Sequence, residues 1–320
     1  IFIDKEGKRI VERSNDYDEE KRKEKILSYF MSLQETKILG RQTPSVGKWN
    51  ERANVWKKEQ KRNPKGDARA ASAVRFLEEK GILGANSHIV DIGCGPGRFA
   101  AAFARKAERV VGLDISENMV QNGREYLQSE GITNAELRIC DFQELDIDRE
   151  DYREAFDLVF MSMTPAVRGL EGLRKAIAMS RAWCCNISHI SWENHLQKQM
   201  MEELFGRKME RKWIGASFYS LFNVLFLMGY HPETSYEKRH QENFVLADEE
   251  YARSAMEHML PKEEASEEQL ERIHTWLLSH ANEKGEIKEV IDYCYGRIVW
   301  DVREKTTRPN YLEPEGVKSI

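Results

Sequence analysis

Three glycines at alternate positions form the most informative residue cluster in this chain. Residues 88–98 read HIVDIGCGPGR, in which an apolar run reaches Asp91 and is followed by Gly93, Gly95 and Gly97. Glycine lets the backbone turn tightly and approach a ligand more closely than a residue with a Cβ atom can. The helix expected next also presents free amide groups in its first turn. The pattern therefore predicts a cradle for a nucleotide-like ligand.

The glycine spacing discriminates between kinds of nucleotide. The dinucleotide fingerprint needs glycine at the first, third and sixth positions, and the sixth position counted from Gly93 is Arg98. This departure disfavours a pyrophosphate-bearing dinucleotide and favours a ligand with an adenosine but no phosphate. An NAD(P) site and a strand-to-helix turn without any ligand stay open as lesser alternatives.

Acidic residues end two further apolar runs. Asp114 closes the run VVGLD, near the spacing at which a carboxylate bonds ribose hydroxyls. Asp141 and Phe142 follow the third run, where they could bond an exocyclic amine and flank a purine ring. Ligand sites in open α/β sheets lie at the carboxyl ends of the strands, so these three ends should converge on one crevice. A helix-capping role for Asp114 and a solvated role for Asp141 are the alternatives.

The elements that must position these residues alternate in type from His88 onward. Strands are expected at 89–91, 110–114, 136–139, 158–161 and 183–190, with helices at 98–106, 117–129 and 170–180. This alternation predicts an α/β fold with a doubly wound, mostly parallel sheet and helices on both of its faces. Further helices are expected at 49–59, 68–80, 214–230 and within 248–289, and a late strand at 295–303.

The segments DIGCGPG, GLDIS and CDFQEL, in this order and spacing, resemble the motifs of the class I, Rossmann-like S-adenosylmethionine-dependent methyltransferases of the small-molecule type. The resemblance covers about residues 84–190 and implies a seven-stranded sheet. It also implies S-adenosyl-L-methionine as cofactor and S-adenosyl-L-homocysteine as product. Carried over by position, the residues implied to contact the cofactor are Asp91, Gly93, Gly95, Gly97, Asp114, Ile115, Asp141, Phe142, Met161 and Ser162.

The resemblance also assigns these residues to parts of the cofactor. Asp91 and the first two glycines would surround the methionine part, and Asp114 would bind the ribose. Ile115 would pack on the adenine, with Asp141 and Phe142 on its other side. The two residues that end the fourth strand would border both cofactor and acceptor.

A methyl acceptor would lie beyond these strand ends. Candidate residues for holding it are Trp49, Thr164, Trp192 and Tyr219. Trp49 shares a helix face with Trp56, and this helix would form a lid or simply dock on the core. His189 is the candidate general base, with a packed or capping role as the alternative. Thr164-Pro165 lacks the Asn-Pro-Pro-aromatic motif of amino-group methyltransferases, which lowers the odds of a base or glutamine as acceptor.

The chain is expected to divide into three parts. A charged extension would occupy residues 1–45, and the N-terminal helices with the Rossmann-like core would occupy 46–190. Residues 191–320 would supply cap helices and the final strands. An enclosed cap favours a small-molecule acceptor, to which the methyl group would pass by in-line displacement.

The overall charge argues against a chain that grips nucleic acid. Lys and Arg number 49 against 54 Asp and Glu, for a formal net charge of −5. A local exception is the segment 48–69, where Lys57, Lys58, Lys61, Arg62 and Lys65 could contact phosphates. An RNA-modifying methyltransferase is therefore one alternative, and a non-catalytic cofactor-binding module is another.

The number and spacing of the cysteines bear on metal binding and on the cellular compartment. Five cysteines without any C-x-x-C pair disfavour a zinc site or a disulfide framework, so no metal is expected and a reducing cytoplasm fits best. Charged residues recur through residues 1–10, so the apolar h-region of a signal peptide is not expected there. The apolar stretch 214–230 is too short and too interrupted for a membrane span. The oligomeric state does not follow from the sequence.

Overall fold

The computed structural model describes residues 12–33, 45–53, 68–209 and 214–307, with side chains from residue 21 onward. The chain forms two compact units. The first comprises residues 1–188, 217–234 and 297–320, and the second comprises 189–216 and 235–296. The second unit is thus an insertion in two pieces. This division differs from the expected boundary at residue 190, because residues 217–234 and the end of the last strand return to the first unit.

Seven strands form one sheet in the order β3-β2-β1-β4-β5-β7-β6. Strand β1 pairs in parallel with β2 and β4, β2 with β3, and β4 with β5. The predicted fold class, a doubly wound and mostly parallel seven-stranded sheet, is confirmed. The strands are β1 (His88–Ile92), β2 (Arg109–Asp114), β3 (Ala135–Ile139), β4 (Phe156–Ser162), β5 (Ser180–Asn194), β6 (Glu233–Leu246) and β7 (Glu286–Asp301).

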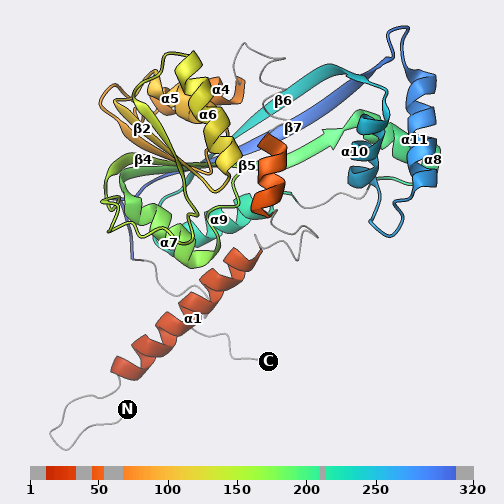
Figure 1. Ribbon diagram of the computed structural model, residues 1–320. Coiled ribbons are helices and arrows are strands. Elements are labelled where there is room, and N and C mark those ends of the chain that lie inside the picture. The colour runs from red at the N-terminus through yellow and green to blue at the C-terminus, as the bar shows by residue number, and fades with distance from the viewer. Residues whose placement is uncertain (1–11, 34–44, 54–67, 210–213, 308–320) are drawn as a thin grey trace, which may run out of the picture. The chain divides into compact units, whose positions relative to one another are not determined.

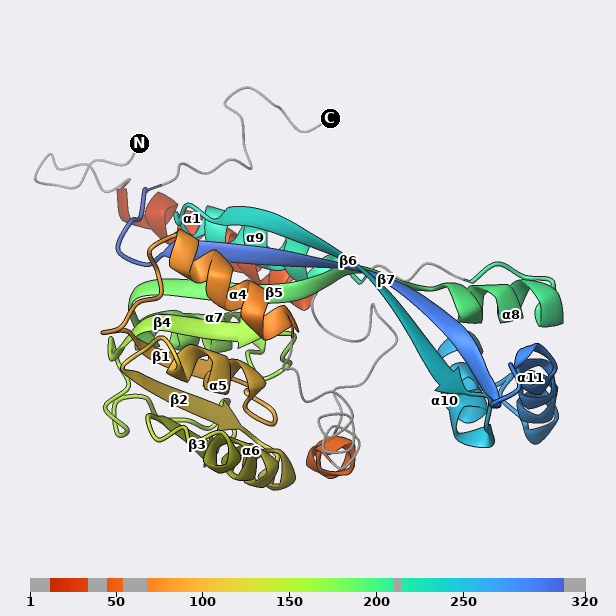
Figure 2. The ribbon, with the colours of Figure 1, turned by 90° about the horizontal axis from the view of Figure 1, so that it is seen from above.

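Helices cover both faces of the sheet in the first unit. Figures 1 and 2 show α4, α5 and α6 on one face and α7 and α9 on the other. Their bounds are α4 (Ala68–Glu79), α5 (Arg98–Ala104), α6 (Glu117–Ser129), α7 (Gly169–Met179) and α9 (Ala216–Leu227). The N-terminal extension contributes α1 (Glu12–Ser32), whose Ser32 Oγ donates to the Tyr29 carbonyl at 2.7 Å near the end of the helix.

The central strands are apolar on both sides because helices bury both faces. Ile89, Val90 and Ile92 of β1 are fully buried. On the α5 side, Phe160 of β4 packs against Phe99 and Phe103, with ring centroids 5.0 and 4.8 Å apart. This aromatic cluster anchors the short helix that follows the glycine turn.

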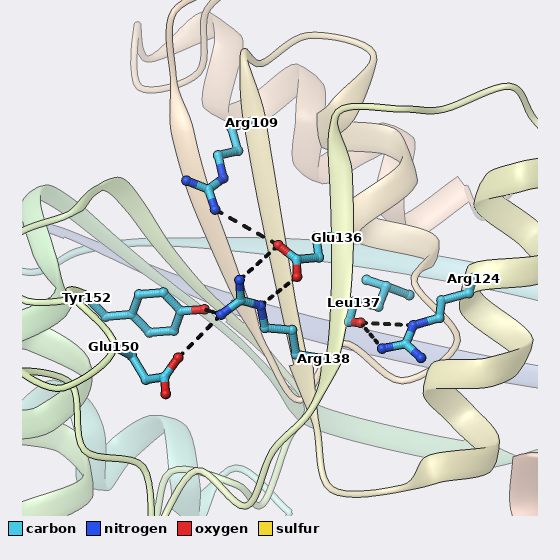
Figure 3. Close-up of polar contacts among 7 residues, drawn as sticks. All are labelled: Arg109, Arg124, Glu136, Leu137, Arg138, Glu150 and Tyr152. Carbon is cyan, nitrogen blue, oxygen red and sulfur yellow. Dashed lines mark hydrogen bonds and ion pairs between the residues drawn. The ribbon is translucent and has the colours of Figure 1, made fainter.

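Strand β3 is tied to its neighbours by polar contacts at its outer side (Figure 3). The guanidinium of Arg138 donates to the Tyr152 hydroxyl at 2.7 Å and to Glu136 Oε1 at 2.8 Å. It also lies 3.4 Å from Glu150, so it joins β3 to the far end of the loop that leaves it. On the other side, Arg124 of α6 donates to the Leu137 carbonyl at 2.8 Å. These exposed pairs stabilise the fold only slightly, but they restrain the loop after β3.

The second unit contains α8 (His195–Phe205), α10 (Glu249–Met259) and α11 (Glu267–His280). Their apolar faces form a core of their own, which includes Met200, Ile273 and Leu277. A polar group lies within this unit: Glu289 accepts hydrogen bonds from Asn194 at 2.7 Å and from Tyr251 at 2.6 Å. Burial and the bond to Glu289 raise the pKa of the Tyr251 hydroxyl.

Strand β6 has no counterpart in the prediction from sequence. Its residues ETSYEKRHQENFVL carry few apolar side chains, because the strand lies at the sheet edge and much of it is exposed. Likewise β5 and β7 extend further than the apolar runs indicate. No helix in the described part of the chain has the length and apolar character that crossing a bilayer requires.

Candidate functional site

The turn after β1 has a backbone that favours glycine. Gly93, Gly95 and Gly97 have φ angles of +73°, +52° and +72°, a region that side-chain-bearing residues rarely adopt. The amides of Gly93 and Cys94 both donate to the Leu113 carbonyl, at 2.7 and 3.0 Å. The turn is therefore fastened to the end of β2 before α5 begins.

Thr164 lies directly against this turn. A Cβ atom added to Gly93 would stand 1.9 Å from Thr164 Oγ1 and 2.5 Å from Thr164 Cβ. Only glycine fits at position 93 while Thr164 keeps this place. The structure thus brings together the glycine turn and a residue that follows β4 and was predicted to hold the acceptor.

The carboxylate of Asp114 faces the turn. Its Oδ2 accepts a hydrogen bond from the Gly95 amide at 2.8 Å, and its Oδ1 accepts one from the Ser116 amide at 2.9 Å. Burial raises the pKa of Asp114, and the two backbone donors oppose that rise. The residue that caps α6 is Ser116 and not Asp114, since the Ser116 hydroxyl accepts a hydrogen bond from the Met119 amide.

Asp91 is the buried carboxyl of the site. It is 1% exposed, and its Oδ2 has no hydrogen-bond partner among the described residues. Burial, followed by the nearby charge of Asp114, raises the pKa of Asp91 to about 8. A buried polar atom without a partner is costly, so a cationic group bound beside Asp91 would relieve both the repulsion and the desolvation.

The loop after β3 carries the other predicted residues. Asp141 Oδ1 accepts from the Gln143 amide at 2.9 Å, which shapes the start of the loop. The Phe142 side chain is 2% exposed, and the Lys175 ammonium lies 5.5 Å from its ring centre. That ammonium also donates to the Gln143 carbonyl at 2.6 Å and so ties the loop to α7.

Gln143 was not singled out by the sequence, yet it connects two strand ends. Its Nε2 donates to the Ala166 carbonyl at 2.5 Å, which joins the loop after β3 to the loop after β4. In that second loop, Thr164 Oγ1 accepts from the Ala166 amide at 3.1 Å. A chain of contacts thus runs from Gln143 through Ala166 and Thr164 to Gly93. A lone glutamine in a loop gives no sequence signal of such a role.

The end of β4 supplies the residues predicted to border the cofactor and the acceptor. Met161 is buried, and Ser162 Oγ is a buried atom without a hydrogen-bond partner in the described part of the chain. Arg69 of α4 reaches the next residue, with its Nη1 4.0 Å from Met163 Sδ. Ile115, which follows Asp114, is half-buried.

A helical segment over residues 46–53 lies beside the end of β2. The Ser116 hydroxyl donates to Asn50 Oδ1 at 2.6 Å, and Asn122 donates to the Ala53 carbonyl at 3.1 Å. The guanidinium of Arg52 covers the Trp49 ring at 4.8 Å. The segment therefore docks on the first turns of α6. Trp56 and the basic residues from Lys57 to Lys65 lie outside the described residues.

The remaining predicted residues contact aromatic rings within their own units. His189 and Trp192 belong to the second unit, where the His189 ring lies 5.0 Å from the ring of Tyr295. Tyr219 lies on α9 with its ring 6.0 Å from that of Phe30 of α1. The described residues contain no cluster of three or more His, Cys, Asp or Glu side chains that could hold a metal ion.

Comparison with known proteins identifies the core. Residues 83–203 match a family model described as a methyltransferase domain. An Acinetobacter baumannii ubiquinone biosynthesis O-methyltransferase is 32% identical over 72 residues, which are 22% of this chain and 30% of that protein. A Hahella chejuensis 23S rRNA (uracil(1939)-C(5))-methyltransferase is 37% identical over 71 residues, 22% of this chain and 15% of that protein. The chain spans less than half the length of these relatives.

Solved structures of low sequence identity align with much of the chain. A SAM-dependent methyltransferase from Aquifex aeolicus aligns with 72% of this chain and 88% of its own, with 14% identity and a TM-score of 0.40. The match over residues 83–203 shows a methyltransferase domain in this part of the chain, of a family that uses S-adenosylmethionine as methyl donor.

Proposed function

We propose that the chain transfers the methyl group of S-adenosylmethionine to a small-molecule nucleophile. The observation that carries the proposal is the bond from the Gly95 amide to Asp114 Oδ2, because it sets a carboxylate beside a turn of glycines. A carboxylate in this place would accept both hydroxyl protons of a ribose. The glycines leave room for the rest of the nucleoside.

The residues present fit this cofactor. S-adenosylmethionine carries a sulfonium and an ammonium group, and Asp91 offers a buried carboxyl with one oxygen left without a partner. The proposed contacts of the methionine part are Asp91, Gly93 and Gly95, and Gly97 is a further proposed cofactor residue of the same turn. Asp114 would bind the ribose, and Ile115, Asp141 and Phe142 would surround the adenine. Met161 and Ser162 would border the cofactor and the acceptor.

The bound cofactor supplies an already activated methyl group, so the chain has to bind, align and exclude water rather than form a covalent bond. Thr164, held against Gly93, is proposed to limit where an acceptor can approach. The acceptor contacts proposed from the sequence are Trp49, Trp192 and Tyr219. His189 is proposed, also from the sequence, as the base that removes a proton where the acceptor is a hydroxyl, a phenol or an ammonium.

Two features of the sequence bear on the class of acceptor. The net charge of −5 and the absence of the Asn-Pro-Pro-aromatic motif support a small molecule. A second candidate is RNA, since one relative modifies 23S rRNA and the segment 48–69 is basic. An RNA-modifying enzyme would lose affinity for RNA steeply as salt is raised.

One experiment tests the cofactor and the class of methyl acceptor separately. Calorimetry with S-adenosylhomocysteine and with NADH should show binding of the first ligand alone. Transfer of a labelled methyl group is then measured into a small-metabolite extract and into purified RNA, with the Asp114→Ala variant as control. Label in a small molecule is expected. Label in RNA would replace the small-molecule proposal, and cofactor binding without transfer to either would favour a non-catalytic module.

A further inference from the structure

Strand β6 is a long edge strand. Among the described residues it ends the strand order, with β7 as its neighbour. Figure 1 draws the two strands side by side. It has 14 residues and contains neither proline nor glycine. Edge strands offer a row of backbone donors and acceptors to another strand, and proteins usually shorten, bend or interrupt them. No proline or glycine interrupts β6, and the charged side chains along it select which strand can pair with this edge.

The two faces of β6 differ in character. Side chains alternate along a strand, and Val245, on the odd-numbered face, packs against the helical core of the second unit. The even-numbered face carries large exposed side chains: Tyr236 is 58% exposed, Phe244 65% and Leu246 54%. Adjacent exposed apolar groups, such as Phe244 and Leu246 on this face, mark interaction sites.

We propose that the chain self-associates by pairing β6 antiparallel with β6 of a second copy, with His240 on the two-fold axis. In this register Lys238 of each copy lies opposite Glu242 of the other, and Tyr236 lies opposite Phe244. Each pair occurs twice. Cross-strand pairs of opposite charge and of aromatic rings are the contacts that stabilise antiparallel sheets.

The registers centred within two residues of His240 are less favourable than the one centred on it. Residues that lie opposite each other across the two-fold axis share a face of the sheet, so both are even-numbered or both are odd-numbered. The axis must therefore pass through a residue position and not between two residues. Centring on Lys238, Arg239 or Glu242 would place a charge directly opposite its own copy. Centring on Gln241 would set Lys238 against Phe244. Like charges that face each other across two strands are destabilising.

Contacts inside each copy are compatible with this pairing. On the odd-numbered face Arg239 already forms an ion pair with Glu237 of its own strand. On the even-numbered face His240 Nδ1 lies 2.8 Å from Asp292 Oδ1, so a proton on the axial imidazole has a counter-charge within its own chain. Glu242 lies 2.8 Å from Lys288 and 3.4 Å from His240 Nε2 of its own chain, and its exposed carboxylate would share a third cation with Lys238 of the second copy.

The identity of the partner follows from self-complementarity. A strand that matches an unrelated protein has no reason to match itself in charge and in aromatic pairing at once. Residues 235–246 all belong to the second unit, so this surface is argued independently of the glycine turn and of methyl transfer.

The test is a charge exchange on the full chain, read by sedimentation velocity over a series of concentrations. The wild-type chain is expected to dimerise. Lys238→Glu alone sets Glu against Glu242 twice, and Glu242→Lys alone sets Lys against Lys238 twice, so each variant should dimerise at least about tenfold more weakly. An equimolar mixture of the two variants restores both opposite-charge pairs and should form a heterodimer.

Two measurements keep the result interpretable. Lys284→Glu alters an exposed lysine outside β6 and should dimerise as the wild type does. Circular dichroism and S-adenosylhomocysteine binding should stay unchanged in all variants, which separates this test from the proposed function. A wild-type chain that stays monomeric at its highest soluble concentration would overturn the proposal. So would a dimer that ignores both substitutions, or variants that fail to pair when mixed.

Discussion

The Oδ2 atom of Asp114 lies 2.8 Å from the backbone nitrogen of Gly95. Asp114 ends β2 and Gly95 lies in the turn after β1, and the register of these two neighbouring parallel strands sets Ile92 opposite Leu113. Asp114 therefore ends β2 one position beyond the last residue of β1, where its side chain can reach the turn. Because the carboxylate is fixed by a backbone amide on each side, it is held in place before a ligand arrives.

Replacing Asp114 tests its proposed role as the ribose ligand. Asp114→Ala should weaken binding of S-adenosylhomocysteine by ~1–3 kcal/mol, because the ribose hydroxyls lose their acceptor. Asp114→Asn keeps one oxygen and should lose less. Calorimetry measures both, with the unfolding temperature recorded to show that each variant is folded. An unchanged affinity in a folded Asp114→Ala protein would reject the ribose assignment.

A methyl group at position 93 tests the contact between the turn and Thr164. Gly93→Ala places a Cβ 1.9 Å from Thr164 Oγ1, so that loop must move. Gly131→Ala is the matched control, since its φ of +67° is similar and nothing lies within 4 Å of the added atom. In both variants the free energy of unfolding should fall by ~1–2 kcal/mol, because alanine disfavours the left-handed backbone conformation. In Gly93→Ala the free energy of unfolding should fall by ~1–3 kcal/mol more, because of the steric clash. This variant should also bind the cofactor poorly. Equal losses on chemical denaturation would contradict the steric argument.

Much of the first unit could be predicted because burial shapes its sequence. Strands covered on both faces read as continuous apolar runs, and the acidic residues that end them stand out. Asp91 and Asp114 could be found in this way. Position 93 could be found because the left-handed turn admits little but glycine.

Other features of the structure have no recognisable pattern in the sequence. Strand β6 is polar because it is an exposed edge, so its composition is typical of a surface segment. Gln143 and Asn50 act through contacts to residues 23 and 66 positions away, a separation that local spacing cannot reveal. The position of His189 depends on where β5 passes into the second unit, and apolar periodicity does not mark that boundary.

Gln143 is expected to act as a positioning residue. Gln143→Ala removes the bond to the Ala166 carbonyl and frees the loops after β3 and β4 from each other. Cofactor affinity should fall by ~0.5–1.5 kcal/mol, the usual worth of one hydrogen bond. Gln128→Ala, on the exposed side of α6, serves as control. Hydrogen exchange of residues 141–145 should become faster in the Gln143 variant alone, and unaltered exchange would argue against a connection between the loops.

Asn50 tests whether the segment 46–53 influences the ligand site. Its side chain accepts from the Ser116 hydroxyl at 2.6 Å, and Asn50→Ala removes this contact. If the segment acts as a lid, cofactor should dissociate several-fold faster while the free energy of unfolding changes by ~1 kcal/mol or less. Stopped-flow fluorescence of Trp49 would follow dissociation. An unchanged dissociation rate together with a lower stability would indicate a helix that only docks on the core.

Asp91 makes both stability and cofactor binding depend on pH. Its pKa is about 8 in the folded chain and 3.8 in an unfolded one. Between these values the folded state holds a proton that the unfolded state has lost. Stability should therefore fall as pH rises from about 4 to about 8, by at most about 1.4 kcal/mol per pH unit from this group. Asp91→Asn should remove this slope, and the exposed control Glu79→Gln should keep it.

The same group links cofactor binding to proton release. A cationic ligand favours the ionised carboxylate, so binding below about pH 8 should release a proton from Asp91. Calorimetry of S-adenosylmethionine binding at pH 7, in two buffers of different ionisation enthalpy, measures the protons released. The wild-type chain should release a fraction of a proton that shrinks above pH 8, and Asp91→Asn should release none from this site. Equal release by both proteins would place the ionising group elsewhere and leave Asp91 without a part in binding the cation.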